Sequence, residues 1–132
     1  MALLFIDLDG FKAINDSQGH EAGDMVLREV ASRLHKCIRQ TDTAVRLGGD
    51  EFTVVLENLV NDATDANKVA KKILTVIQRP IRLGTMTVNI SASIGIAVHY
   101  PNEVNTADQL VNRADAAMYE AKRAGKGRVF LQ

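Results

Sequence analysis

The stretch from Val88 to Val98 constrains the fold more than any other part of the chain. Apolar residues recur at every second position and therefore share one face of an extended strand (Val88, Ile90, Ala92, Ile94, Ile96 and Val98). From Ser91 onward the alternate positions hold only small residues, which lets a helix approach the strand closely (Ser91, Ser93, Gly95 and Ala97). The pattern predicts a long sheet strand with a helix packed closely on its small-residue face.

Three amphipathic helices are predicted from apolar residues at helical spacing. They cover Asp24 to Arg39, Thr64 to Ile77, and a segment that starts with the capping box Thr106-x-x-Gln109. Pro80 follows the second helix as a stop signal, and Gly125 ends the third in the position after its C-cap.

The remaining segments have the composition of strands and turns. A buried strand over Ala2–Ile6 enters a loop at Asp7–Gly10, a hairpin turns at Gly48-Gly49, a small hairpin turns at Leu83-Gly84, and Arg128 to Leu131 closes the chain. The order is strand, helix, hairpin, helix, hairpin and strand, helix, strand. It predicts one α+β domain over residues 1–132, with a mixed sheet and helices packed against it.

Charge and composition exclude several classes of protein. Sixteen basic residues balance sixteen acidic ones, so no net charge favours nucleic acid or direct contact with an anionic membrane. The single cysteine, Cys37, cannot form an intramolecular disulfide and fits a reducing compartment. No run is apolar enough to span a membrane and no signal peptide is present, so we expect a cytoplasmic protein or the cytoplasmic part of a membrane-anchored one.

Acidic residues follow two of the predicted strands. Asp7 and Asp9 end the first strand, and Asp50 and Glu51 come directly after the double glycine. If the two strands are neighbours, these carboxylates converge, repel one another and favour Mg²⁺, which supports phosphoryl and nucleotidyl transfer. Asp beside Gly is also common in ordinary turns, and the spacing alone does not decide between the two interpretations.

Four ordered blocks cover nearly the whole chain and resemble the GGDEF domain family. They are FIDLDGFKAIND at 5–16 with GHEAGD at 19–24, RLGGDEF at 46–52, SIGIA at 93–97, and ADAAMYEAKRAG at 114–125. The resemblance implies a palm-like nucleotidyl cyclase fold with a mainly antiparallel central sheet flanked by helices. It also implies a diguanylate cyclase, which condenses two GTP into cyclic di-GMP and two pyrophosphates with Mg²⁺ or Mn²⁺.

The resemblance also implies roles for the acidic residues. Asp7 and Asp50 would be carboxylate ligands of the catalytic metals, with the backbone carbonyl of Leu8 assisting. Asp50 and Glu51 would be the catalytic pair. Because neighbouring residues on an extended strand point to opposite faces, Asp50 and Glu51 cannot serve identical roles. Glu51 would either hold a second cation or help to deprotonate the nucleophile. The alternative for Glu51 is a solvated strand residue.

Nucleotide contacts follow from the same resemblance. Asn15 and Asp24 match the guanine-reading pair, since a carboxylate can accept from N1–H and N2–H₂ of guanine and would favour GTP over ATP. Alternatively, Asp24 is a helix N-cap and Asn15 closes a turn. The loop Gly10-Phe11-Lys12 would wrap the phosphates. Lys122 and Lys126 would contact them, unless they merely complement a helix dipole.

Arg39 and Asp42 resemble the RxxD site through which cyclic di-GMP inhibits many members of this family. Arg39 would bind phosphate or guanine and Asp42 would accept from guanine. By contrast, His20, His35 and His99 show no metal-ligand spacing with Cys37. Zinc chemistry and cysteine catalysis are not expected.

One nucleotide pocket per chain implies a homodimer in which two antiparallel chains each present a GTP. Family members usually carry an upstream segment resembling D-x-L-T-G-L-x-N-R, which is absent here, so we expect a fragment of a larger protein fused to sensor or EAL domains. Two alternatives remain. One is a non-catalytic module that binds GTP or cyclic di-GMP and regulates an attached domain, and the other is a scaffold used only for dimerisation.

Overall fold

The computed structural model describes residues 1–132 and contains a five-stranded sheet in the order β2-β3-β1-β6-β7. The strands are β1 (Ala2–Asp9), β2 (Thr43–Gly48), β3 (Glu51–Leu56), β6 (Ser91–Val98) and β7 (Val129–Leu131). All neighbouring pairs are antiparallel except β6 with β7. The predicted mixed, mainly antiparallel sheet is therefore confirmed, and β1 is its central strand.

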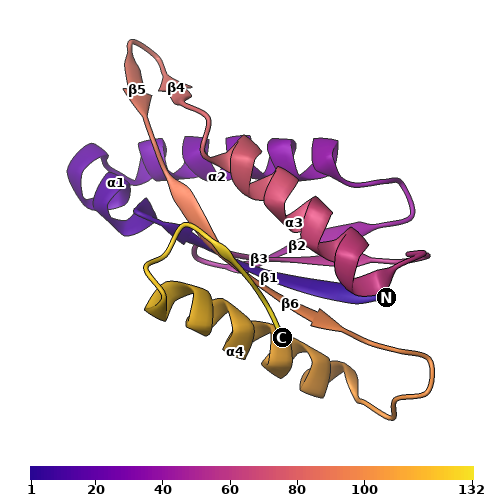
Figure 1. The fold of residues 1–132 in the computed structure, drawn as a ribbon. Helices are drawn as coiled ribbons and strands as arrows, with labels where there is room; N and C mark the ends of the chain where they lie inside the picture. Colours follow the sequence, from indigo (N-terminus) through magenta and orange to yellow (C-terminus); the bar gives the residue numbers. More distant parts are fainter.

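Helices cover both faces of this sheet (Figure 1). They are α1 (Phe11–Gln18), α2 (His20–Cys37), α3 (Asp62–Ile77) and α4 (Ala107–Arg123). Figure 1 shows α2 and α3 above the sheet and α4 below it. No helix combines the length and the apolar character that crossing a bilayer requires.

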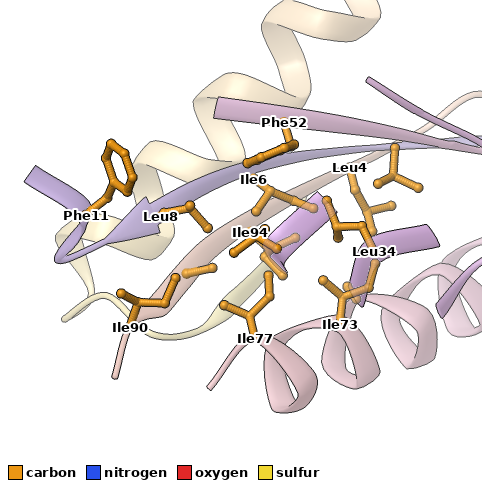
Figure 2. Close-up of a cluster of buried hydrophobic side chains, with 14 of the residues drawn as sticks. Leu4, Ile6, Leu8, Phe11, Leu34, Phe52, Ile73, Ile77, Ile90 and Ile94 are labelled. Atoms are coloured by element: carbon orange, nitrogen blue, oxygen red, sulfur yellow. The ribbon is translucent and has the colours of Figure 1, made fainter. Parts of the chain in front are cut away.

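The core has two parts because β1 is buried on both faces. Leu4, Ile6 and Leu8 point into the larger cluster with α2 and α3, part of which is drawn in Figure 2. Leu3 and Phe5 point the other way and pack with Leu110, Ala114 and Met118 of α4. Such alternation of inward positions is the period-2 pattern of a strand.

The small-residue face of β6 does admit a helix, as the sequence predicts. A Cβ atom added to Gly95 would lie 2.1 Å from the backbone nitrogen of Met118 and 2.2 Å from the backbone oxygen of Ala114. Only glycine allows this approach, so Gly95 sets the distance between α4 and the sheet.

The predicted strand from Val88 to Val98 is in fact interrupted. Val88 ends β5 (Met86–Val88), which pairs with β4 (Ile81–Leu83) in a separate two-stranded sheet, and β6 starts only at Ser91. Gly84 forms the turn of this hairpin with φ +65°. Val88 and Ile90 nevertheless stay in the core, so the alternation predicted burial correctly and strand continuity wrongly.

Three helices differ from prediction near their starts or in their existence. α2 begins at His20 rather than Asp24, after Gly19 as its N-cap, and α3 begins at Asp62 rather than Thr64. α1 was not predicted, and it begins within a segment that was expected to be a loop. α1 has only eight residues, of which Phe11 and Ile14 are buried, so it carries almost no periodic signal. The capping box of α4 is confirmed, with the Thr106 side chain accepting from the backbone N–H of Gln109.

Candidate active site

The apolar stripes of β1 and α4 become polar at the same end of the domain. Asp7 and Asp9 continue the face of β1 that carries Leu3 and Phe5, because alternate residues share a face. Lys122 follows Met118 by four residues and so continues the buried stripe of α4. The Nζ atom of Lys122 lies 3.2 Å from Oδ1 of Asp7 and 3.7 Å from Oδ1 of Asp9.

The β2–β3 turn brings further carboxylates to this end. Gly48 pairs with Glu51, so the two-residue connection is Gly49-Asp50 rather than the predicted Gly48-Gly49. Gly49 has φ +50°, which confirms the expected need for a positive φ. Asp50 itself lies in the turn, and its backbone oxygen accepts from the N–H of Leu8 at 3.1 Å.

The sheet register places this turn beside the end of β1. Asp7 is the direct cross-strand partner of Glu51 in the antiparallel β1–β3 pair. The structure therefore brings Asp7, Asp50 and Glu51 to one edge, where two of the three lie at a strand end and one in a turn.

Electrostatic repulsion marks this edge. Burial raises the pKa of Asp7, the nearby Asp50 raises it further, and the Lys122 ammonium opposes the change. Burial also raises the pKa of Glu51, with Asp7 as the strongest of its acidic neighbours. Like charges held close together favour the neutral, protonated acids. A bound cation would therefore stabilise the ionised form of the cluster.

The oxygen donors at this edge fit a hard divalent cation. No three carboxylate, imidazole or thiol groups lie close enough to hold a metal ion by themselves. Mg²⁺ does not need such a cage, because it is usually bound by one or two carboxylates together with waters and substrate phosphates. Asp7 and Asp50 supply that number of carboxylates.

Replacing Glu51 with glutamine is expected to stabilise the metal-free protein at neutral pH. A carboxyl group whose pKa is raised on folding contributes stability at low pH and loses it as pH rises through the raised pKa. The free energy of unfolding of the Gln variant should therefore equal that of the wild type at about pH 4. At about pH 7.5 it should be larger by about 0.5 kcal/mol. Urea unfolding in the presence of EDTA measures this free energy. A difference between variant and wild type that shrinks as pH rises would contradict the prediction.

Asp9 plays a different part from Asp7, although the sequence groups them. The Ser93 hydroxyl donates to both Asp9 carboxylate oxygens at 3.1 and 3.0 Å, and the N–H of Gly127 donates to Oδ2 at 3.0 Å. Ser93 is fully buried. Asp9 thus ties the end of β1 to β6 and to the turn after α4. Ser93 and Gly127 were not predicted as site residues. Ser93 stood on the small-residue face of the predicted strand and in the SIGIA block at 93–97, but neither pattern indicated a contact with Asp9.

Gly10, Phe11 and Lys12 form a helix start rather than an extended loop. Gly10 is the N-cap of α1 with φ +87°, and Phe11 and Lys12 are the first residues of the helix. The first amide groups of a helix have no acceptor within it, so this segment presents N–H donors close to Asp7 along the chain.

Asn15 and the neighbour of Asp24 lie against each other. A Cβ atom on Gly23 would lie 2.2 Å from Oδ1 of Asn15, so the Asn15 side chain covers Gly23. Asp24 is exposed in the second turn of α2 and borders a groove whose other lining residues are Leu27, Arg28, Ala31, Arg46 and Phe52. The N-cap alternative for Asp24 is wrong, because Gly19 is the N-cap of α2.

The second predicted phosphate contact, Lys126, lies in the turn after α4. It is exposed and adopts φ +62°, between Gly125 and Gly127, which also have positive φ. Unlike Lys122, Lys126 makes no ion pair in the structure. Lys122 therefore contacts the acidic edge, whereas the exposed Lys126 makes no contact with it.

Arg39 and Asp42 form a connected pair at the other end of α2. The Asp42 carboxylate accepts from the backbone N–H of Arg39 at 2.9 Å and from that of Glu57 at 3.1 Å. Its side chain is only 3% exposed, whereas that of Arg39 is 57% exposed. Asp42 thus has a structural role in joining two loops, and Arg39 is the member of the pair that faces solvent. Arg39 and Asp42 also line an open pocket together with Cys37. Burial raises the pKa of the Cys37 thiol.

The mainly antiparallel sheet with helices on both faces matches the palm-like nucleotidyl cyclase fold of solved GGDEF domains. The family described as "Diguanylate cyclase, GGDEF domain" matches residues 1–128. The chain therefore belongs to the GGDEF domain family.

Individual relatives agree with this assignment. The bifunctional diguanylate cyclase/cyclic di-GMP phosphodiesterase MucR of Pseudomonas aeruginosa is 48% identical over 95% of the chain and 18% of MucR. Diguanylate cyclase TpbB of the same species is 48% identical over 96% of the chain and 29% of TpbB. The chain thus spans less than a third of the length of these two relatives.

Solved structures share the fold closely. The GGDEF domain of TpbB has a TM-score of 0.92 and 47% identity, covering 98% of this chain and 80% of that one. The GGDEF domain of DgcB from Caulobacter crescentus, solved in complex with c-di-GMP, has a TM-score of 0.87 and 30% identity over 98% of this chain and 76% of that one.

Proposed function

We propose that this chain is a diguanylate cyclase domain that joins two GTP molecules into cyclic di-GMP with the help of Mg²⁺ or Mn²⁺. The observation that carries the proposal is the position of Asp7, Asp50 and Glu51 together at one sheet edge, with Asp7 opposite Glu51 and the Asp50 backbone bonded to Leu8. Asp7 and Asp50, with the Leu8 carbonyl, would hold the metal. A bound metal supplies neutralisation of phosphate charge and a lower pKa for an attacking 3′-hydroxyl.

The chain's own residues would bind and orient the nucleotide around that metal. The N-terminal turn of α1, at Gly10, Phe11 and Lys12, offers backbone N–H groups to phosphate. Lys122 and Lys126 add positive charge from the end of α4. Positioning and charge neutralisation are the main contributions that phosphoryl-type transfer needs from a protein.

Guanine selection would rest on Asp24 and Asn15. The exposed Asp24 carboxylate can accept from both N1–H and N2–H₂ of guanine, whereas adenine offers it a lone pair at N1. An unpaired carboxylate in a binding site costs affinity, so GTP is favoured over ATP. Support comes from the Asn15 side chain, which lies against Gly23, the residue before Asp24.

Two chains are needed because the product contains two phosphodiester bonds and the proposal gives each chain one nucleotide site. In an antiparallel homodimer the 3′-hydroxyl of each GTP attacks the α-phosphorus of the other, and two pyrophosphates leave. The rate of product formation should therefore rise more steeply than linearly with protein concentration while dimers are scarce.

The proposed function is tested by incubating the purified chain with GTP and Mg²⁺ and separating the nucleotides by chromatography. Cyclic di-GMP and pyrophosphate in a ratio of one to two are the expected products, and ATP should give no corresponding cyclic dinucleotide. EDTA should stop the reaction. GTP binding without any product would instead favour a regulatory GGDEF domain that holds nucleotide without turnover.

Cyclic di-GMP is also proposed to bind at Arg39 and Asp42 and to inhibit its own synthesis. The Arg39 side chain is 57% exposed and its guanidinium donates to Asp42 and to the backbone oxygen of Glu57, so its remaining N–H groups are the ones available to phosphate or guanine. Asp42 is largely committed to backbone N–H groups. Arg39→Ala should therefore weaken binding of cyclic di-GMP by roughly tenfold or more, the loss typical of a charged hydrogen-bonding partner. Isothermal titration calorimetry measures this, with the exposed Arg123→Ala as the matched control. Equal affinities in both variants would remove Arg39 from the product site.

A regulatory GGDEF domain is the second candidate. MucR, which is bifunctional by name, is more than five times longer than its matching segment, so such domains occur within larger proteins. In that arrangement the chain would hold GTP or cyclic di-GMP and control an attached sensor or EAL domain. The acidic edge argues for catalysis, because a site that only binds nucleotide has less need of three mutually repelling carboxylates.

A further inference from the structure

Lys122 provides the only cationic group in ion-pair contact with the acidic edge. Its Nζ atom lies 3.2 Å from Asp7 and 3.7 Å from Asp9, and the three side chains are 27%, 14% and 10% exposed. A partly buried ion pair of this kind is screened less by solvent and salt than an exposed one. The lysine is therefore a substantial part of the charge balance of this site.

The two carboxylates do not depend on Lys122 equally. Asp9 already accepts from Ser93 and from Gly127, so its oxygens are hydrogen-bonded without the lysine. The Asp7 side chain has Lys122 as its one partner, which both hydrogen-bonds to it and forms an ion pair with it. The ammonium thus neutralises the carboxylate that would ligate a metal, while Asp9 helps to hold the ammonium near it.

An ammonium and a divalent cation cannot both sit against Asp7 without repelling each other. A lysine has a flexible stem with three donors at its tip, so it can move from a carboxylate to a phosphate oxygen at little cost. Nucleotide phosphates at the end of α4 would offer Lys122 that second partner. Asp7 would then be free to ligate the metal.

We propose, building on the function proposed above, that Lys122 is the resident counter-cation of the nucleotide-free site and makes metal binding depend on nucleotide. Phosphate draws the ammonium away from Asp7, and the divalent cation takes its place. Linkage requires the reverse as well, so the metal strengthens nucleotide binding by the same factor. The Lys122–Asp7 ion pair thus disfavours metal binding until the nucleotide is bound.

The test is a Mn²⁺ titration of the nucleotide-free protein followed by electron paramagnetic resonance. Lys122→Met keeps the length and helical preference of the side chain and removes its charge. It should bind Mn²⁺ roughly three- to tenfold more tightly than the wild type, because one nearby positive charge is gone. Arg123→Met, which removes an exposed charge from the same turn, should leave the affinity unchanged. A non-hydrolysable GTP analogue should raise the Mn²⁺ affinity by a larger factor in the wild type than in Lys122→Met.

Unchanged or weaker Mn²⁺ binding by Lys122→Met would overturn the proposal, and so would a lack of Mn²⁺ binding in every variant. Lys122→Gln serves as a second neutral variant if Lys122→Met does not show the wild-type melting transition. The titration involves no turnover. If the wild type makes no cyclic di-GMP and Lys122→Met still gains Mn²⁺ affinity, the cyclase function fails while the role of Lys122 stands.

Discussion

Asp50→Asn is expected to lower the rate of cyclic di-GMP formation by about a thousandfold or more, the loss typical of removing a central source of transition-state stabilisation. The change keeps the size of the side chain and removes one of the two carboxylates proposed to hold the metal. It should not disturb the turn, because the hydrogen bond to Leu8 uses the backbone oxygen of residue 50. Initial rates with GTP and saturating Mg²⁺ measure the effect.

A matched control separates this loss from a general effect of charge. Asp108→Asn removes a carboxylate from the first turn of α4, at the opposite end of that helix from Lys122, and should keep the wild-type rate. Asp50→Asn should also keep the wild-type melting temperature in EDTA and lose the increase that Mg²⁺ with a GTP analogue gives the wild type. Comparable rates in Asp50→Asn and the wild type would remove Asp50 from the catalytic site.

Gly95→Ala is expected to destabilise the domain by about 3 kcal/mol or more, at the upper end of the cost of overpacking a core. The added methyl group would meet backbone atoms of Ala114, Ala117 and Met118, between 2.1 and 2.7 Å away. A flexible side chain could move aside, whereas a helix backbone has to shift as a whole. Urea unfolding monitored by circular dichroism gives the free energy of unfolding.

The control for backbone strain is Gly84→Ala in the β4–β5 turn. Gly84 has φ +65° with no heavy atom near the position of a new Cβ, so the variant loses backbone freedom without a clash. It should cost about 1 kcal/mol, the usual penalty for a non-glycine residue in this region. If Gly95→Ala costs no more than Gly84→Ala, then α4 does not rest on Gly95 as the structure indicates. Because α4 carries Lys122, the Gly95 variant should also have weakened nucleotide binding.

Much of the fold could be predicted because its determinants are local. The alternation around Gly95 predicted both buried faces of β6, and Thr106 with Gln109 predicted the start of α4. The eight-residue α1 could not be predicted in the same way, since two buried residues do not establish a helical period. The exact hairpin turn also escaped prediction, because a bulge between Arg46 and Gly48 shifts the register by one residue.

The candidate site depends on contacts between distant segments, and here the sequence was less informative. Adjacent acidic residues suggested that the end of β1 meets the β2–β3 turn, and the structure brings them together. Residue spacing alone could not distinguish Asp7 from Asp9, and only the family resemblance assigned the metal to Asp7. Their difference arises from Ser93 and Gly127, which lie 84 and 118 residues further along the chain than Asp9.

The central claim is that a divalent cation is held between the end of β1 and the acidic turn. Crystals grown with Mn²⁺ and a non-hydrolysable GTP analogue test it through the anomalous signal of the metal. We expect a peak at about 2.1 to 2.3 Å from carboxylate oxygens of both Asp7 and Asp50, with Lys122 moved onto phosphate. A metal bound only to the nucleotide, with Asp7 still paired to Lys122, would contradict the account.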